Sequence, residues 1–273
     1  MPYANNNGVK IHYEVEGQGS PLMLVHGMGG SMERWRWTGY IQELSKNHRL
    51  ILIDNRGFGK SDKLYEPSAF EFKNLVGDLL AVLDKLGIEK TGYFGYSMGG
   101  KIGYRIPIYA PKRFNYLMLG GMGYPITGNE ERDDPIVNQT TEDLENALRE
   151  APKNPMEYFA TTQEKRQGAP FPPDRRAILL GNDARSWLAW AYFDRNQISP
   201  KAAEVLPKIK VPCLIFTGEA DPWYPLAKKC SALMPGAKFI SLPGLDHAAA
   251  FQLSDLVLPI VKEFLKARLV NDA

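Results

Sequence analysis

The chain has 273 residues, of which 44% are hydrophobic, so it can bury a large core and is expected to form one α/β domain with room for an insertion. Its 33 basic and 31 acidic residues leave a formal net charge of +2, which excludes the charge pattern typical of proteins that bind nucleic acid or anionic membranes. We therefore expect the partner to be a small molecule.

The first part of the chain predicts a hairpin followed by buried strands. VKIHYEVEG (residues 9–17) alternates apolar and polar side chains, as a half-exposed strand does. PLMLVHG (21–27) and RLILIDNRG (49–57) are apolar runs typical of strands that are buried on both faces. SMERWRWTGYIQELSKN (31–47), which lies between them, predicts a crossover helix.

A second helix and two further strands are predicted around a serine. Residues 70–87 place apolar side chains at a 3.6-residue period and stop at Gly87, which predicts a helix. TGYFG (91–95) predicts a strand that runs directly into Ser97. The helix expected after Ser97 contains Gly103 and Pro107, so we expect a kink or an early end there.

Residues 124–206 differ in character from the rest of the chain. Prolines and charges separate short helical pieces such as TEDLENALRE and RSWLAWAYFDR, and no segment there reads as a convincing strand. Strand patterns precede this segment in YLMLGG and resume after it in VPCLIFTGEAD and AKFISLPGLDH, before a closing helix. We therefore expect residues 1–123 and 207–273 to form an α/β core with a mostly parallel sheet, and residues 124–206 to form a helical cap inserted into it.

The N-terminal segment and the cysteines indicate a cytoplasmic protein. MPYANNNGVKIHYEVEG has no apolar stretch behind a basic start, and no window approaches eighteen uninterrupted apolar residues. Cys213 and Cys230 are too few for a disulfide framework and lack metal-ligand spacing. We expect structural thiols, no membrane span, and neither a metal nor a cofactor. The sequence carries no signal for an oligomeric state.

GYSMGG places Ser97 where a strand meets a helix, between Gly95 and Gly99. Small neighbours permit the sharp, strained turn that lifts a serine hydroxyl above the sheet. A serine nucleophile needs a histidine base, which in turn is oriented by a carboxylate. The alternative interpretation of GYSMGG is a flexible glycine-rich linker.

His247 is the predicted base among the four histidines of the chain. It follows the last predicted strand, on a loop at the carboxyl edge of the sheet, where open parallel sheets bind ligands. His12 and His48 are expected to be structural or solvated, because one lies inside the hairpin and the other precedes a strand. His26 is expected to shape the glycine-rich loop that follows it.

Asp221 is the predicted orienting carboxylate, since it follows the strand before the histidine strand by a few residues. Glu219 and Asp246 are the alternative candidates for this carboxylate. Acyl transfer also needs N–H donors for the developing oxyanion. We expect these donors to be the backbone amides of Met28, in VHGMGGS, and Met98, which follows the nucleophile.

Taken together, these motifs resemble the α/β-hydrolase fold family over nearly the whole chain. The residues that carry the resemblance lie in the family's order at 26–30, 54–61, 95–100, 218–221 and 246–247. The resemblance implies the same roles for Ser97, His247, Asp221, Met28 and Met98. Dehalogenases and epoxide hydrolases of this fold carry aspartate where Ser97 stands, so their reactions are disfavoured.

The motif GYSMGG resembles the corresponding motif of serine esterases and lactonases of this family. The menaquinone-pathway synthase of the fold usually has an arginine directly after the motif, where this chain has Lys101. We therefore expect a cofactor-free serine hydrolase of carboxylic esters or lactones that forms an acyl-enzyme. The alternatives are a carbon–carbon bond hydrolase or lyase that uses the same residues, and a non-catalytic small-molecule receptor.

Aromatic side chains are the candidates for an apolar or aryl substrate pocket. The alternative is that the aromatic run of residues 187–193 only pins a helix to the core. The expected lining is Trp35, Trp187, Trp190, Tyr192 and Trp223.

Overall fold

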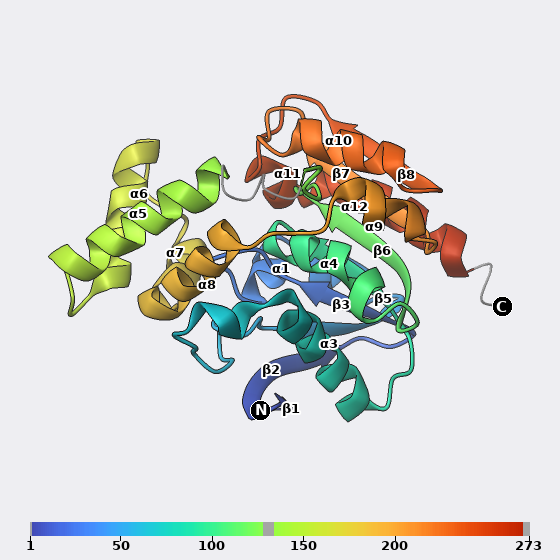
Figure 1. The fold of residues 1–273 in the computed structure, drawn as a ribbon, viewed down its shortest axis with the longest axis horizontal. Coiled ribbons are helices and arrows are strands. Elements are labelled where there is room, and N and C mark those ends of the chain that lie inside the picture. The colour runs from blue at the N-terminus through green and yellow to red at the C-terminus, as the bar shows by residue number, and fades with distance from the viewer. Residues whose placement is uncertain (1, 128–133, 270–273) are drawn as a thin grey trace.

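The computed structural model describes residues 2–127 and 134–269. In this part of the chain, eight strands form one sheet in the order β1-β2-β4-β3-β5-β6-β7-β8 (Figure 1). The two pairings of β2, with β1 and with β4, are antiparallel, and the other neighbours pair in parallel. The strands are β1 (Tyr3–Asn6), β2 (Val9–Glu16), β3 (Ser20–Val25), β4 (His48–Ile53), β5 (Thr91–Tyr96), β6 (Phe114–Gly120), β7 (Cys213–Gly218) and β8 (Ala237–Leu242).

Helices cover both faces of the sheet, because strands buried on both sides alternate their apolar side chains between two cores. One core gathers Met23, Val25 and the apolar sides of α3 (Phe72–Leu86), α4 (Met98–Tyr109) and α10 (Tyr224–Leu233). The other gathers Leu22, Leu24 and the apolar sides of α1 (Glu33–Trp37), α2 (Tyr40–Leu44) and α12 (Ser254–Leu269). The short helix α11 (Ala249–Gln252) precedes α12, and a 3-10 turn, η1 (Pro67–Phe70), precedes α3.

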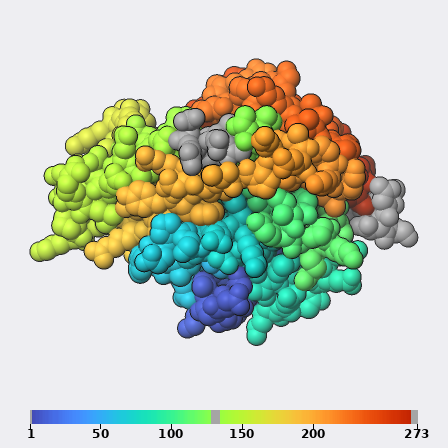
Figure 2. All heavy atoms as spheres, in the orientation of Figure 1, coloured from blue at the N-terminus to red at the C-terminus, as the bar shows by residue number. Residues whose placement is uncertain are grey.

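The chain between β6 and β7 contributes helices and no described strand. These helices are α5 (Pro135–Glu150), α6 (Pro155–Gln167), α7 (Pro173–Leu180), α8 (Ala184–Asn196) and α9 (Ala202–Val205), followed by the 3-10 turn η3 (Leu206–Lys208). The first four pack on one another. In addition, α7 contacts α1 of the core, and α8 contacts η1. Figure 2 shows α5 and α6, in yellow-green, projecting at one end of the molecule.

Most elements lie where the sequence predicts them, with two differences. Residues 31–47 form two short helices instead of one crossover helix, because Gly39 adopts a left-handed φ of 83° between α1 and α2. Helix α4 runs through Gly103 and ends at Tyr109, two residues after Pro107, so an end at Gly103 is wrong. A Cβ at Gly103 would lie 2.3 Å from the side chain of Leu119, so glycine allows α4 to pack closely on the sheet.

None of the helices within the described residues is both long enough and apolar enough to cross a membrane.

Candidate active site

Ser97 occupies a strained turn between β5 and α4. Its φ of 55° and ψ of −114° lie in a region that side chains other than glycine rarely adopt. The turn is fixed by a hydrogen bond that the Ser97 N–H donates to the carbonyl of Gly120, at 2.9 Å. Added Cβ atoms at Gly95 and Gly99 would approach backbone oxygens to 2.4 and 2.2 Å, so only glycine fits at both flanks. The glycines of GYSMGG therefore permit the turn, and contacts with β3 and β6 hold it in place.

The loops after β7 and β8 bring a carboxylate and a histidine to Ser97. The Ser97 Oγ lies 3.0 Å from Nε2 of His247, and the His247 Nδ1 lies 2.8 Å from Oδ2 of Asp221. Asp221 is buried, and its other oxygen accepts the Trp223 N–H at 3.0 Å. With the Nδ1 proton held by Asp221, Nε2 is available to accept the serine proton. The three side chains can thus act as nucleophile, base and orienting acid.

The two competing carboxylates are engaged elsewhere. Glu219 accepts a hydrogen bond from the Ser241 hydroxyl at 2.6 Å. Asp246 accepts the N–H groups of Ala248 and Ala249, where the chain enters α11. Neither is recorded as a partner of the imidazole among the described residues, so Asp221 alone has the contact that the mechanism needs.

Tyr96 is a positioning residue that the sequence interpretation missed. Its buried hydroxyl donates a 2.7 Å hydrogen bond to the backbone carbonyl of His247, and the two rings lie 5.4 Å apart. Burial, reinforced by the negative charge of Asp221, raises the pKa of Tyr96 well above its usual value, so the hydroxyl keeps its proton. Its position next to the nucleophile was the only sequence signal.

The glycine-rich loop after β3 passes beside the nucleophile. Met28 lines the same small cavity as Ser97 and Met98, and a Cβ at Gly27 would lie 3.1 Å from the Ser97 Cβ. Met98 is the first residue of α4, where N–H groups have no partner inside the helix. The structure thus brings both predicted oxyanion donors to the serine.

His26 fixes this loop from inside the protein. Its Nδ1 donates to the Gly27 carbonyl at 2.8 Å, and its Nε2 accepts the Asn55 N–H at 3.1 Å. Burial lowers the pKa of His26 to about 4, against a weaker opposing effect of Asp54, so the ring is neutral and can accept at Nε2. This agrees with the predicted shaping role of His26.

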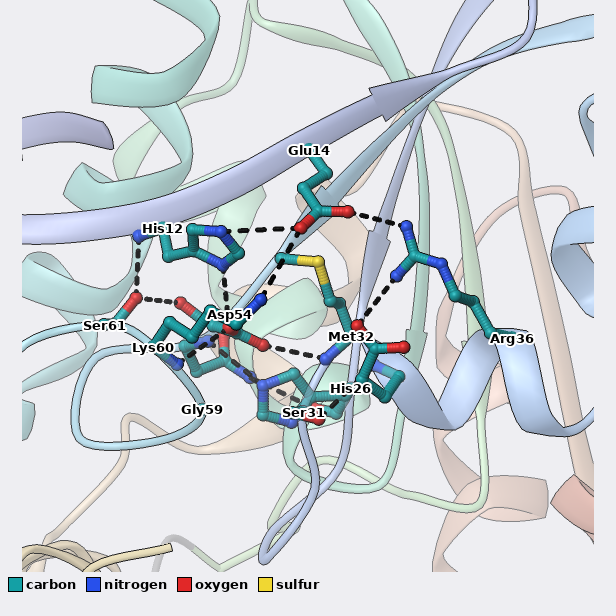
Figure 3. Close-up of polar contacts among 12 residues, drawn as sticks. His12, Glu14, His26, Ser31, Met32, Arg36, Asp54, Gly59, Lys60 and Ser61 are labelled. Carbon is teal, nitrogen blue, oxygen red and sulfur yellow. Dashed lines mark hydrogen bonds and ion pairs between the residues drawn. The ribbon is translucent and has the colours of Figure 1, made fainter. Parts of the chain in front are cut away.

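Asp54 at the end of β4 ties the same loop to its neighbours (Figure 3). One carboxylate oxygen accepts the Met32 N–H at 2.8 Å, and the other accepts the Lys60 N–H and Nδ1 of His12, each at 2.9 Å. Burial alone would raise the pKa of Asp54, but the hydrogen bond from His12 and the other donors lower it overall. Asp54 is therefore an ionised anchor of the loop, and His12 is structural, as predicted.

Met28 lines two separate cavities. The one next to Ser97 holds about 10 Å³, and Trp190 and Trp223 line it. The second holds about 150 Å³ and lies between the loop of Met28 and helices α5 to α8. Its lining is Met28, Gly29, Arg34, Thr140, Phe159, Gln163, Phe171, Arg175, Ile178, Leu179 and Trp187.

Three of the five predicted pocket aromatics line these cavities, and two do not. Trp187 lines the larger cavity, and Trp190 and Trp223 line the smaller one. Trp35 is a correction, because it is fully buried on the opposite face of the sheet, packed against Tyr40, Phe94 and Phe251. The pocket prediction is also wrong for Tyr192, whose hydroxyl donates to Glu145 at an exposed position.

The chain matches the alpha/beta hydrolase fold family over residues 20–251. It is 26% identical to pimeloyl-[acyl-carrier protein] methyl ester esterase of Legionella pneumophila, over 94% of this chain and 100% of that one. It is 34% identical to 2-hydroxymuconate semialdehyde hydrolase of a Pseudomonas species, over 44% of each chain. The chain spans less than half the length of the curated relatives that it matches at 30–34% identity.

A solved structure from work on carboxylesterases of the thaumarchaeon Nitrososphaera gargenis has the same fold. It superposes with a TM-score of 0.81 at 20% identity and covers 100% of both chains. The eight-stranded, mostly parallel sheet is consistent with the family match, which covers most of the chain. This protein belongs to the alpha/beta hydrolase fold family.

Proposed function

We propose that the protein is a serine hydrolase that cleaves carboxylic esters, lactones included, through an acyl-enzyme. The observation that carries this proposal is the continuous hydrogen-bonded chain from Ser97 Oγ through His247 to Asp221, with distances of 3.0 and 2.8 Å. These distances are within the reach that proton transfer to a general base requires. The similarity to a methyl ester esterase supports ester cleavage.

In the proposed first step, the Ser97 hydroxyl attacks the ester carbonyl while His247 Nε2 takes its proton. The buried carboxylate of Asp221 stabilises the imidazolium that forms. The N–H groups of Met28 and Met98 donate to the oxyanion, and the protonated His247 then delivers its proton to the leaving alcohol.

In the second step, His247 activates a water molecule that attacks the acyl-enzyme. Collapse of the second tetrahedral intermediate releases the carboxylic acid and returns the proton to Ser97. We further propose that residues 124–206 act as a cap over this site, since Trp187 and Trp190 of α8 line the two cavities. Movement of this cap would then control which acyl groups enter.

The test is hydrolysis of p-nitrophenyl esters from acetate to dodecanoate by the wild type and by Ser97→Ala. We expect the wild type to favour short acyl chains, because the cavities are small, and the variant to lose about 10⁴-fold or more in kcat. Ser68→Ala changes an exposed serine of η1 and should keep full turnover. A Ser97→Ala protein that hydrolyses the esters like the wild type would refute the proposal.

A further inference from the structure

The larger cavity is lined by two arginines from different parts of the fold. Arg34 comes from α1 of the core, and Arg175 comes from α7, which packs against α1. Nothing in the local sequence of either residue separates it from a surface arginine. Only the packing of α7 on α1 brings both to one cavity.

Neither guanidinium has an acidic partner within ion-pair distance among residues 2–127 and 134–269. The Arg34 Nε is buried and without a hydrogen-bond partner in this part of the chain. Each guanidinium instead faces an aromatic ring, Arg34 over Phe251 at 4.9 Å and Arg175 over Phe171 at 4.0 Å.

Two other arginines of the described residues, one partly and one fully buried, are paired with carboxylates. Arg36 is bound by Glu14, Glu16 and Glu33, and Arg56 forms a two-pronged contact with Asp78 at 2.6 Å per bond. A buried cation without a counter-ion is costly, so proteins normally pair it. Among the described residues, the two guanidiniums of this cavity therefore have no carboxylate at ion-pair distance.

The electrostatics agree with this geometry. Burial, and secondarily the charge of Arg175, lowers the pKa of Arg34 to about 10. Burial also lowers the pKa of Arg175, partly offset by Asp246. Both guanidiniums remain protonated at neutral pH, so an anion entering the cavity would meet two like charges that repel each other in its absence.

We propose that Arg34 and Arg175 form a carboxylate-binding subsite, so that the natural substrate is an ester or lactone whose acyl chain carries a second, ionised carboxylate. A planar guanidinium group can donate two parallel hydrogen bonds to the two oxygens of a carboxylate. This inference rests on the proposed ester hydrolysis at Ser97.

The position of Met28 places the carboxylate on the acyl side of the scissile bond. Met28 lines both cavities, so the larger cavity lies next to the predicted oxyanion donor and is the space nearest Arg34 and Arg175 for an acyl chain to occupy. His247, which protonates the leaving alcohol in the proposed mechanism, is not among the residues that line the larger cavity.

The test compares two esters of equal chain length, mono-4-nitrophenyl adipate and 4-nitrophenyl hexanoate, which differ by a terminal carboxylate. We expect the wild type to favour the adipate ester at least about 10-fold in kcat/KM. The ratio of the two kcat/KM values should fall about 10- to 100-fold in Arg34→Gln and in Arg175→Gln, and Arg34→Lys should recover part of it.

Arg185→Gln is the matched control, since Arg185 is exposed on α8, and it should keep the wild-type ratio. Circular dichroism and thermal melts confirm that each variant is folded. A wild type that hydrolyses both esters without preference, or glutamine variants that keep the wild-type ratio, would overturn the subsite while leaving ester hydrolysis standing.

Failure of the proposed function gives a different result, in which the wild type hydrolyses neither ester. Calorimetric titration of adipate into the folded Ser97→Ala protein then tests carboxylate binding at the subsite independently of ester hydrolysis. Binding that Arg34→Gln weakens about 10-fold or more supports the carboxylate subsite. Absence of adipate binding by Ser97→Ala overturns it.

Discussion

At the scale of single residues, the site depends on side chains whose protonation is set by their surroundings. His26 must stay neutral so that its Nε2 can accept the Asn55 N–H, and burial ensures this by lowering its pKa to about 4. Tyr96 must keep its proton to hold the His247 carbonyl, and burial favours that state too. These groups take no part in the proposed proton transfers, but they fix the loops that carry Met28 and His247.

The pKa of His26 makes a prediction about stability and pH. The unfolded chain binds this proton near the ordinary pKa of 6.5, whereas the folded protein binds it only near 4. Between these values the unfolded state holds more protons than the folded state. The contribution of His26 to the free energy of unfolding is therefore complete above pH 6.5 and falls as the pH is lowered to 4. At 1.36 kcal/mol per pH unit, this interval corresponds to about 3 kcal/mol.

Urea unfolding from pH 4 to 7.5 measures this effect, with His26→Gln as the comparison. Glutamine cannot titrate, so the stability advantage of the wild type over His26→Gln should shrink as the pH falls. Equal pH slopes for the two proteins between pH 4 and 6.5 would contradict the assignment of His26 as a buried neutral ring.

At the scale of elements, the nucleophile turn is held by close contact between β3, β5 and α4. A Cβ at Gly99 would lie 2.2 Å from the Val25 carbonyl oxygen, and one at Gly27 would press on the Ser97 Cβ. Ser97 can keep its strained φ only because the surrounding backbone leaves it no alternative. The glycines are therefore a requirement of packing as much as of turn geometry.

We expect Gly99→Ala to destabilise the protein by about 1–3 kcal/mol, because backbone has to move to admit the methyl group. It should also lower kcat, since the displaced strand carries the loop of Met28. Gly181→Ala is the control, because an added Cβ there meets only ordinary contacts of 3.4 Å and longer. Thermal melts and p-nitrophenyl ester assays of both variants measure the effect, and equal behaviour would contradict the packing argument.

At the scale of the whole molecule, a buried ion cluster joins the core to the helices between β6 and β7. Lys101 of α4 binds Asp194 of α8 and lies 3.5 Å from Asp134, the N-cap of α5. All three side chains are buried, and the Lys101 ammonium also faces the ring of Trp223 at 5.2 Å. Lys101 thus connects α4, which follows Ser97, with α5 and α8, two of the helices that line the cavities described above.

Lys101→Met should cost about 3–5 kcal/mol of unfolding free energy, because it removes the buried ammonium that binds the carboxylate of Asp194. Limited proteolysis should then cleave first within residues 135–196, where the anchored helices lie. Lys73→Met removes an exposed lysine from α3 and should leave both measurements near the wild type. Wild-type stability for Lys101→Met would show that the cluster does not hold the two parts together.

Much of the fold follows from local patterns. Apolar runs bounded by turns predict the strands, and the 3.6-residue period ending at Gly87 predicts α3. The division of residues 31–47 into two helices was missed, because one left-handed glycine at position 39 gives no signal that distinguishes it from a tolerated helical glycine. The continuation of α4 through Gly103 was missed because the compensating contact with Leu119 is tertiary.

The sequence by itself determined the strands of the sheet, the serine flanked by glycines, and Asp221 and His247 as its expected partners, because these depend on residues close together in the chain or on strand ends that meet at one edge. Only the tertiary structure decided that Glu219 and Asp246 are hydrogen-bonded to other groups, and that Trp35 lies in the core. It also decided that Arg34 and Arg175 share one cavity. The physical reason is that contacts between distant segments depend on how helices pack on the sheet, which no local pattern encodes.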